Sequence, residues 1–226
     1  MDLVSNVLFE DNHLLAVNKP AGILVQGDQT GDPSLVDFAK EYLRVKYNKP
    51  GQAYLGLIHR LDRPVSGVVL LAKTSKALSR MNLVFQQRQV KKYYWALTEN
   101  RPPQESDSLV HWLTKNTRDN RAKAHKREVP QAKRSELEYS LKMMMEKKYL
   151  LEVLPITGRP HQIRVQLSTI GCPILGDAKY GYKGPASRII ALHAKSLHFN
   201  HPVKKEPLVI EAPLYMDEIW KPFNSN

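Results

Sequence analysis

The feature that most constrains the fold is an apolar run, Val68–Ala72, that follows a charged turn within the stretch "GLIHRLDRPVSGVVLLAK". Five consecutive apolar residues, bounded by the turn formers Pro64 and Gly67, predict a buried strand. A histidine, two arginines and one aspartate stand directly before that strand. Loops that enter rigid strands often carry functional residues, so this turn is the first candidate site.

Short apolar or alternating segments far outnumber helical ones along the chain, and most neighbouring strands look antiparallel. This pattern predicts an α+β fold with a central, mostly antiparallel mixed sheet flanked by helices, in one domain that spans residues 1–226. Strands are expected at residues 7–10, 14–19, 68–72, 92–99, 135–143, 148–155, 189–194, 196–199 and 208–211. Helices are expected at residues 34–48, 75–87 and about 160–171, the first with a capping box formed by Ser34 and Asp37.

The charge balance indicates what kind of partner the chain binds. There are 34 basic and 22 acidic residues among 226, which leaves a net charge of +12. Such an excess favours a polyanion, most commonly nucleic acid, and the alternative is a merely basic soluble protein. Residues 101–134 are expected to be irregular. Within them, eight basic residues face two acidic ones over 115–134, a run expected to be a mobile loop that could contact phosphate.

Cysteine usage and hydropathy bear on location. Cys172 is the single cysteine, so no internal disulfide can form, which fits a reducing compartment. The first twenty residues lack the basic and apolar blocks of a signal peptide, and no run reaches the roughly 18 apolar residues of a membrane helix. We therefore expect a cytoplasmic protein that does not bind membranes.

Two clusters of charged and polar residues could carry chemistry. Asp62 between Arg60 and Arg63 would stay ionised and suit a nucleophile or base, although a structural ion pair explains the same spacing. The segment "TGRPHQIR" gathers Arg159, His161, Gln162 and Arg164 at a helix start, where they form either an anion site or part of an ordinary surface helix.

Two further groups of side chains have ready alternatives. In "KKYYWAL", Tyr93 and Tyr94 face opposite sides of a strand, so one belongs to the core and the other could stack on a base. His193, His198 and His201 match no zinc-binding spacing, so we expect no metal.

Five segments together resemble the motifs of the RluA-type pseudouridine synthases in order and spacing. They are "NKPAGILV", "HRLDRPVSGVVLLAK", "VKKYYWAL", "ITGRPHQIRVQLSTIGCPILGDAKYG" and "ALHAKSLHFNHP", which together span nearly the whole chain. The resemblance implies the pseudouridine synthase fold and isomerisation of uridine in structured RNA, either rRNA or tRNA, by a monomer without metal or organic cofactor. It also implies a single catalytic domain, without the small N-terminal RNA-binding domain that some members carry.

The same resemblance assigns roles to individual residues. It implies Asp62 as the catalytic aspartate, Tyr94 as the active-site tyrosine and Arg164 as the arginine that pairs with the aspartate. Arg60 is then associated with base flipping, and Arg63, Lys92, Arg159, His161 and Gln162 complete the expected RNA-binding set.

The chain departs from the family's usual pattern at three positions. Val65 and Pro160 stand where the family usually has threonine, and Gln166 stands where it has histidine, a change expected to alter an RNA contact. Two other functions are compatible with the motifs: a non-catalytic RNA-binding module that kept the fold, and a glycosylase that releases free uracil.

Overall fold

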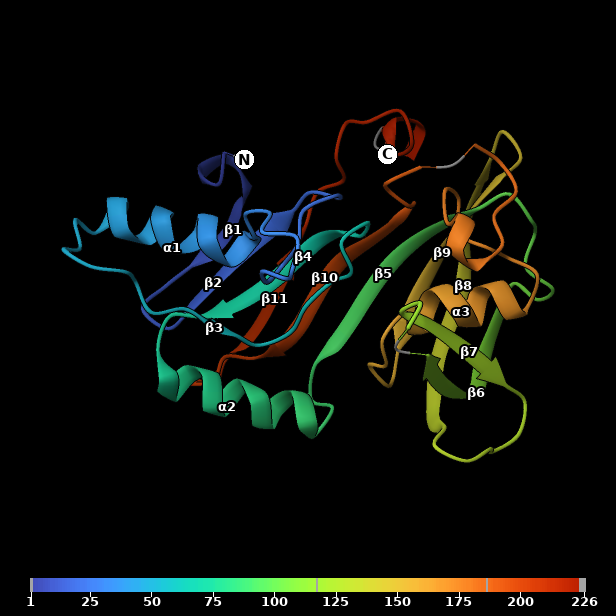
Figure 1. Cartoon of the computed structure of the whole chain (residues 1–226), viewed down its shortest axis with the longest axis horizontal. Helices are drawn as coiled ribbons and strands as arrows, with labels where there is room; N and C mark the ends of the chain where they lie inside the picture. The colour runs from blue at the N-terminus through green and yellow to red at the C-terminus, as the bar shows by residue number, and fades with distance from the viewer. Residues whose placement is uncertain (1, 117, 186, 224–226) are drawn as a thin grey trace. The chain divides into compact units, whose positions relative to one another are not determined.

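The computed structural model describes residues 2–116, 118–185 and 187–223 (Figure 1). The chain divides into two compact units, which are described separately. Unit 1 contains the residues up to Val90 and Ala194–Tyr215, and unit 2 contains Lys91–His193 and the segment from Met216 onward.

Unit 1 is built on a sheet with the strand order β1-β2-β4-β10. Its strands are β1 (Val7–Glu10), β2 (Leu14–Lys19), β3 (Gly56–Leu57), β4 (Ser66–Ala72), β10 (Leu192–Asn200, whose first two residues belong to unit 2) and β11 (Pro207–Glu211). The pairs β1–β2, β2–β4, β3–β4 and β10–β11 are antiparallel. Every residue of β2 and β4 is buried, as the apolar run at Val68–Ala72 predicts.

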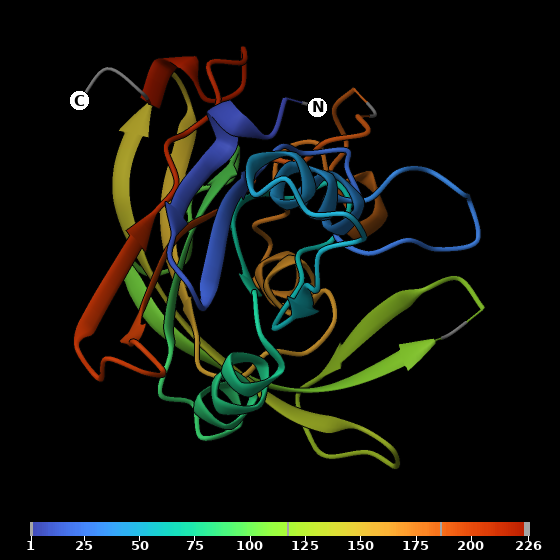
Figure 2. The ribbon, with the colours of Figure 1, turned by 90° about the vertical axis from the view of Figure 1, so that its left-hand side faces the viewer.

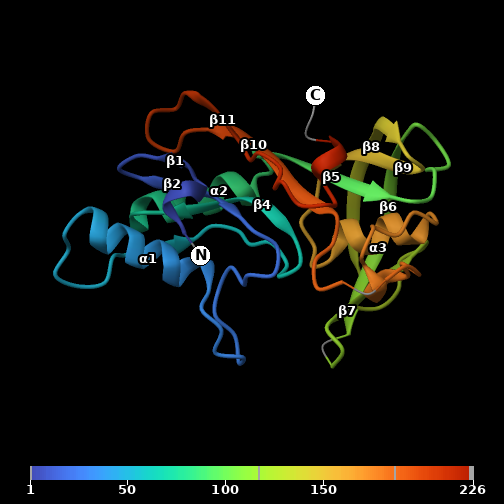
Figure 3. The same ribbon diagram turned by 90° about the horizontal axis from the view of Figure 1, so that it is seen from above.

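Two amphipathic helices pack on one side of this sheet, as Figures 2 and 3 show. Helix α1 (Leu35–Lys46) begins with the expected capping box between Ser34 and Asp37 and buries Leu35, Ala39 and Leu43. Helix α2 (Ser75–Gln86) is capped by Thr74 and buries Ala77 and Met81. A short 3-10 turn, η1 (Val4–Asn6), precedes β1.

Unit 2 is an antiparallel sheet with the strand order β5-β9-β8-β6-β7. The strands are β5 (Lys91–Thr98), β6 (Ser106–Asn116), β7 (Arg121–His125), β8 (Lys133–Met145) and β9 (Lys148–Pro155). Helix α3 (Gln162–Thr169) lies over one face and contacts β6 and β7 (Figure 1). The turns η2 (Ala178–Tyr180) and η3 (Lys221–Phe223) follow.

The predicted α+β class, with a mostly antiparallel sheet flanked by helices, is confirmed. The irregular, mobile loop predicted at 101–134 is wrong, because most of that segment forms β6, β7 and the start of β8. The two strands predicted at 189–194 and 196–199 are also wrong, since one continuous strand, β10, covers 192–200. The single domain over 1–226 stays a prediction. In the described part of the chain, no helix combines the length and the apolar character that crossing a membrane requires.

Candidate functional site

The turn that carries Arg60, Asp62 and Arg63 connects β3 to β4. The Val65 backbone N–H donates to the Asp62 carbonyl at 3.1 Å, which closes the turn before the chain enters the sheet. His59 anchors the other end, because its Nε2 accepts a hydrogen bond from the Leu70 backbone at 3.0 Å. The His59 ring also stacks on Phe85 of α2, with the ring centroids 5.3 Å apart. The turn is therefore fixed to both the sheet and a helix, and Asp62 lies half-buried upon it.

A second loop, at the end of β2, holds this turn through the fully buried side chain of Lys19. Its ammonium donates to the carbonyls of Ile23 at 2.8 Å, Pro20 at 3.0 Å and Arg63 at 3.3 Å. Burial lowers the pKa of Lys19 from 10.5 to about 7, although the negative charge of Asp62 opposes that fall. Lys19 therefore stabilises the backbone around the turn and places a basic group within the field of Asp62.

The two arginines beside Asp62 have different surroundings. Arg63 donates from Nε to the Gly22 carbonyl at 2.9 Å and pairs with Asp32 at 2.7 Å. The Gly22 N–H returns a 2.7 Å bond to the Arg63 carbonyl, so Arg63 ties the two loops together. Arg60 is exposed on the turn and is available for an external ligand.

In unit 2, β5 presents Lys92 and Tyr94 on one face and Tyr93 on the other, because side chains alternate along a strand. The Lys92 ammonium lies close to Gly158, 3.5 Å from the position that a Cβ on this glycine would occupy. The loop before α3 therefore lies on the face of β5 that carries Lys92 and Tyr94. Tyr93 lines an open groove of about 440 Å³ on the sheet with Asp107, Glu138 and Glu152. The three carboxylates of that groove would repel a phosphate, so the face of β5 that carries Tyr94 is the better candidate for binding a ligand that contains phosphate.

The predicted anion site at the start of α3 contains side chains with quite different roles. Gln162 is buried, accepts from Thr157 at 2.8 Å and from the Arg159 backbone at 2.9 Å, and donates to the Glu136 carbonyl at 3.0 Å. Its amide therefore shapes the loop, and the expectation that Gln162 binds RNA stays a prediction. Arg159 and His161 are partly exposed beside it.

Arg164 is buried and held by Asp177. Its Nε and Nη2 donate to the two carboxylate oxygens of Asp177 at 2.7 and 2.8 Å, a bidentate pair in which both side chains are under a tenth exposed. The pair leaves the opposite edge of the guanidinium, with Nη1, directed away from Asp177. The resemblance implied that Arg164 pairs with Asp62, and Asp177 was not identified from the sequence. The feature that could have indicated it is an acidic residue in an otherwise apolar loop.

Gln166 is fully buried in unit 2. Its amide nitrogen donates to the Leu109 carbonyl at 3.0 Å and lies 3.1 Å from His111 Nδ1. The expectation that Gln166 alters an RNA contact is therefore wrong, because this residue braces α3 against β6. Burial lowers the pKa of His111, which keeps this contact neutral.

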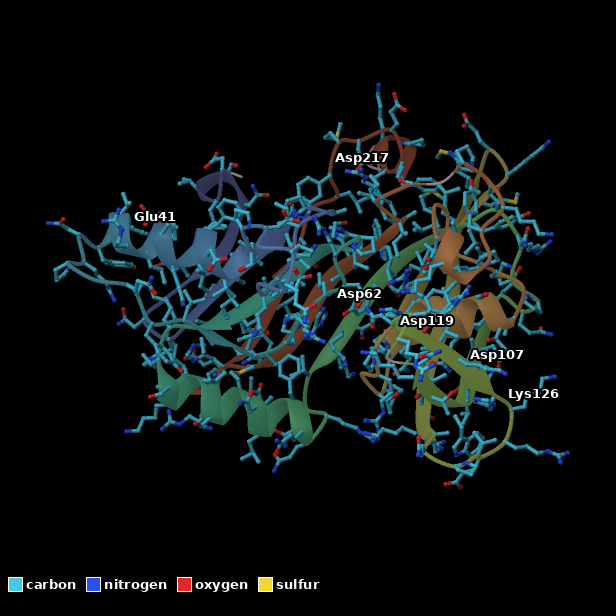
Figure 4. The ribbon with its side chains drawn as sticks, in the orientation of Figure 1. Glu41, Asp62, Asp107, Asp119, Lys126 and Asp217 are labelled. Carbon is cyan, nitrogen blue, oxygen red and sulfur yellow. The ribbon has the colours of Figure 1, made fainter. Side chains whose placement is uncertain are left out.

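The strands β6 and β7 and the loop that follows them form a hairpin with a strongly basic surface, here called the basic hairpin (residues 106–134). On β7 the side chains alternate, with Ala122 buried and the flanking Arg121 and Lys123 exposed. Figure 4 marks Asp119 in the connection between the strands and Lys126 after β7. The exposed basic residues of this segment are Lys115, Arg118, Arg121, Lys123, Lys126, Arg127, Lys133 and Arg134. A fixed basic surface of this kind suits the regularly spaced phosphates of a nucleic acid.

The described residues contain no group of three histidine, cysteine, aspartate or glutamate side chains placed to hold a metal ion.

Comparison with known proteins adds an independent finding. The sequence profile of the RNA pseudouridylate synthase family matches residues 13–169. Ribosomal large subunit pseudouridine synthase C of Buchnera aphidicola subsp. Baizongia pistaciae is 35% identical over 223 residues, which cover 95% of this chain and 68% of that protein. The protein of the same name from Rickettsia prowazekii is 34% identical, over 94% of this chain and 69% of its own length.

Among solved structures, human RNA pseudouridylate synthase domain containing 4 superposes with a TM-score of 0.79 at 26% identity, over 94% of this chain and 90% of its own. Human RNA pseudouridylate synthase domain containing 1 gives a TM-score of 0.74 at 23% identity, over 92% and 83% of the two chains, and supports the fold alone.

Proposed function

The chain belongs to the RNA pseudouridine synthase family, and from this premise we propose that it isomerises uridine in large-subunit ribosomal RNA with Asp62 as the catalytic carboxylate. The two bacterial relatives above are named as ribosomal large subunit enzymes, and this motivates the choice of rRNA over tRNA. Such a substrate would place the enzyme in the cytoplasm. The observation that carries the proposal is the half-buried Asp62 on a turn that Lys19 and His59 immobilise.

The reaction exchanges one glycosidic bond for another. The bond from uracil N1 to ribose C1′ breaks, and its electron pair leaves with N1. The base then turns, C5 bonds to C1′, C5 loses its proton, and N1 gains one. Because the base is retained and no water is consumed, one carboxylate suffices where glycoside hydrolysis commonly needs two.

Asp62 would act at the sugar, either by attack on C1′ or by removal of the C2′ proton. Both routes require the ionised carboxylate. They differ in a measurable way, because only proton removal predicts a primary isotope effect from deuterium at C2′.

The other site residues have complementary roles in this proposal. Tyr94 would stack on the extruded base, and Arg164 would stabilise negative charge on Asp62 during turnover. Extrusion of the uridine costs a few kcal/mol, which contacts to the RNA backbone offset. Arg60, Lys92, Arg159 and His161 would make such contacts close to the reacting nucleotide, and the basic hairpin would make them further along the RNA.

The test is a comparison of Asp62→Asn with wild type on large-subunit rRNA, measured as release of tritium from C5 of uridine. We expect turnover to fall at least about a thousandfold because the reacting carboxylate is lost, while RNA affinity stays within about twofold. Asp107→Asn, a change to an exposed carboxylate in the acidic groove, serves as the matched control (Figure 4). Full turnover by Asp62→Asn would refute the assignment, and free uracil as the product would identify a glycosylase instead.

Mapping of pseudouridine in rRNA and tRNA, from cells with and without the gene, tests the substrate. Loss of a site in large-subunit rRNA is expected. Loss confined to tRNA would refute the choice of rRNA and leave the isomerase assignment intact.

A further inference from the structure

Tyr180 lies at the centre of a buried contact between the basic hairpin and α3. Its ring is 5% exposed and packs with Leu113 of β6, Ala122 of β7 and Val165 of α3. Its backbone is also tied to the helix, because Ser168 Oγ donates to the Tyr180 carbonyl at 2.6 Å. The motif "GDAKYG" that contains Tyr180 has no role in the proposed function so far.

The Tyr180 hydroxyl joins two elements through two short hydrogen bonds. The Ala122 backbone N–H donates to the phenol oxygen at 2.8 Å, and that oxygen lies 2.7 Å from His161 Nδ1. A hydroxyl has a single proton, and here the Ala122 N–H already occupies an acceptor position on the oxygen. The oxygen keeps a second acceptor position and its own proton, so the direction of the bond to His161 Nδ1 depends on the tautomer of the imidazole.

His161 also adopts an unusual backbone conformation. Its φ of 55° lies in the left-handed region, which residues other than glycine seldom adopt. Such conformations persist where surrounding contacts fix them, and they concentrate at functional sites. The bond between Tyr180 and His161 is one such contact, so the hydroxyl contributes to fixing the position of His161.

The Tyr180 ring also contacts Arg164. The guanidinium carbon of Arg164 lies 4.9 Å from the ring centroid, and that of Arg121 in β7 lies 5.7 Å from it. Asp177, at the start of the same short turn, holds Arg164 by its bidentate pair. One turn thus fixes Arg164 by charge and by an aromatic face, two contacts that favour a cation.

We propose that Tyr180 is a positioning residue for the isomerisation, which donates its phenol proton to His161 Nδ1 and couples the seating of the basic hairpin to the orientation of His161 and Arg164. This inference rests on the proposed function of Arg164. RNA bound to the basic hairpin would hold Ala122 and Arg121 in place, and Tyr180 would transmit that order to α3. His161 would then be held in one orientation and one tautomer at the start of α3.

The test combines NMR with kinetics on Tyr180→Phe, which keeps the ring and removes the hydroxyl. In wild type, the ¹⁵N shift of His161 Nδ1 should report an unprotonated acceptor, and in the variant both tautomers should be populated. The value of kcat should fall about tenfold, as expected for one hydrogen bond, with KM within about twofold. Tyr182→Phe is the matched control. The Tyr182 hydroxyl donates to the exposed Glu99 at 3.0 Å, so its removal should leave kcat unchanged.

Several outcomes would overturn the proposal: a wild-type proton on Nδ1, an unchanged kcat, or a kcat loss that merely follows the fraction of folded protein in thermal unfolding. The wild-type spectrum decides alone if Tyr180→Phe does not fold. The NMR measurement needs no turnover. Inactivity of the wild type on rRNA would therefore refute the proposed function, while the tautomer of His161 would still be tested by its spectrum.

Discussion

Glu10 offers a quantitative test of what holds the scaffold of unit 1 together. Its side chain is 7% exposed and accepts four hydrogen bonds. Lys73 at the end of β4 donates at 2.6 Å and Lys46 of α1 at 2.7 Å, while the hydroxyls of Tyr47 and Tyr42 donate at 2.6 and 2.8 Å. One carboxylate therefore connects β1, α1 and the end of the strand that follows the Asp62 turn.

The pKa of Glu10 gives the magnitude. Burial alone would raise it, but the bonds from Lys46, Lys73 and the two tyrosines outweigh burial, and the pKa falls from 4.5 to about 2. At about 1.4 kcal/mol per pKa unit, the ionised carboxylate stabilises the fold by about 3 kcal/mol. Because the folded-state pKa is lowered, this contribution is complete above pH 4.5 and is lost as pH falls through about 2. The raised pKa of Lys46 reports the same contacts, so it adds no further energy.

The assay is urea unfolding of wild type and Glu10→Gln across this pH range. We expect the variant to be less stable by about 3 kcal/mol at pH 7, with the gap closing toward pH 2. Glu41→Gln is the control, since Glu41 lies on α1 and its pair with Arg44 is exposed to solvent, so its loss should leave the free energy of unfolding nearly unchanged (Figure 4). A Glu10→Gln gap below about 1 kcal/mol, or one that does not change with pH, would refute the reasoning.

Three further predictions concern unit 2. Asp177→Asn should lower stability by about 3–5 kcal/mol in urea unfolding, because it leaves the buried Arg164 without its bidentate partner; an effect below about 1 kcal/mol would contradict this. Glu146 and Lys147, at φ of 47° and 64°, form the two-residue turn between β8 and β9. The double change Glu146→Asn and Lys147→Gly should therefore raise the free energy of unfolding by about 1 kcal/mol, and a loss of stability would show that the turn is unstrained. Neutralising Lys115, Lys123 and Lys126 should reduce the slope of log affinity for RNA against log salt by about 2–3. Neutralising Lys40, Lys76 and Lys204 is the control and should leave the slope unchanged. An unaltered slope in the first variant would exclude the basic hairpin from phosphate contact.

The elements that sequence reasoning found are those with a strong apolar signal. Val68–Ala72 has no polar interruption, and Ser34 with Asp37 marks the start of α1 unambiguously, so both are confirmed. Strand β7 was missed because its buried positions are the alanines of "RAKAH", which have a weak preference for strands and are surrounded by charge. In β10, Lys195 divides the apolar positions, and the continuous strand was therefore predicted as two.

Contacts of a buried charge are harder to predict, because they depend on which loops the fold brings together. The resemblance implied that Arg164 pairs with Asp62 and gave no indication of its partner Asp177, thirteen positions further along. Gln162 and Gln166 looked like surface donors on a polar helix, yet both are buried and hydrogen-bonded to backbone carbonyls of the sheet. Helix α3 is buried on most sides, so polar residues on it cannot be assumed to face solvent.

The charged turn at Asp62 illustrates how basic residues beside a carboxylate can serve the scaffold. Arg63 is engaged with Asp32 and the Gly22 carbonyl, and His59 accepts from the Leu70 backbone, so two of the cationic residue types beside Asp62 serve the scaffold. The basic group buried beneath the turn is Lys19, whose lowered pKa reflects the cost of its burial. These contacts hold the backbone on both sides of Asp62, so the turn can present an ionised carboxylate in one place, as the proposed reaction at the sugar requires.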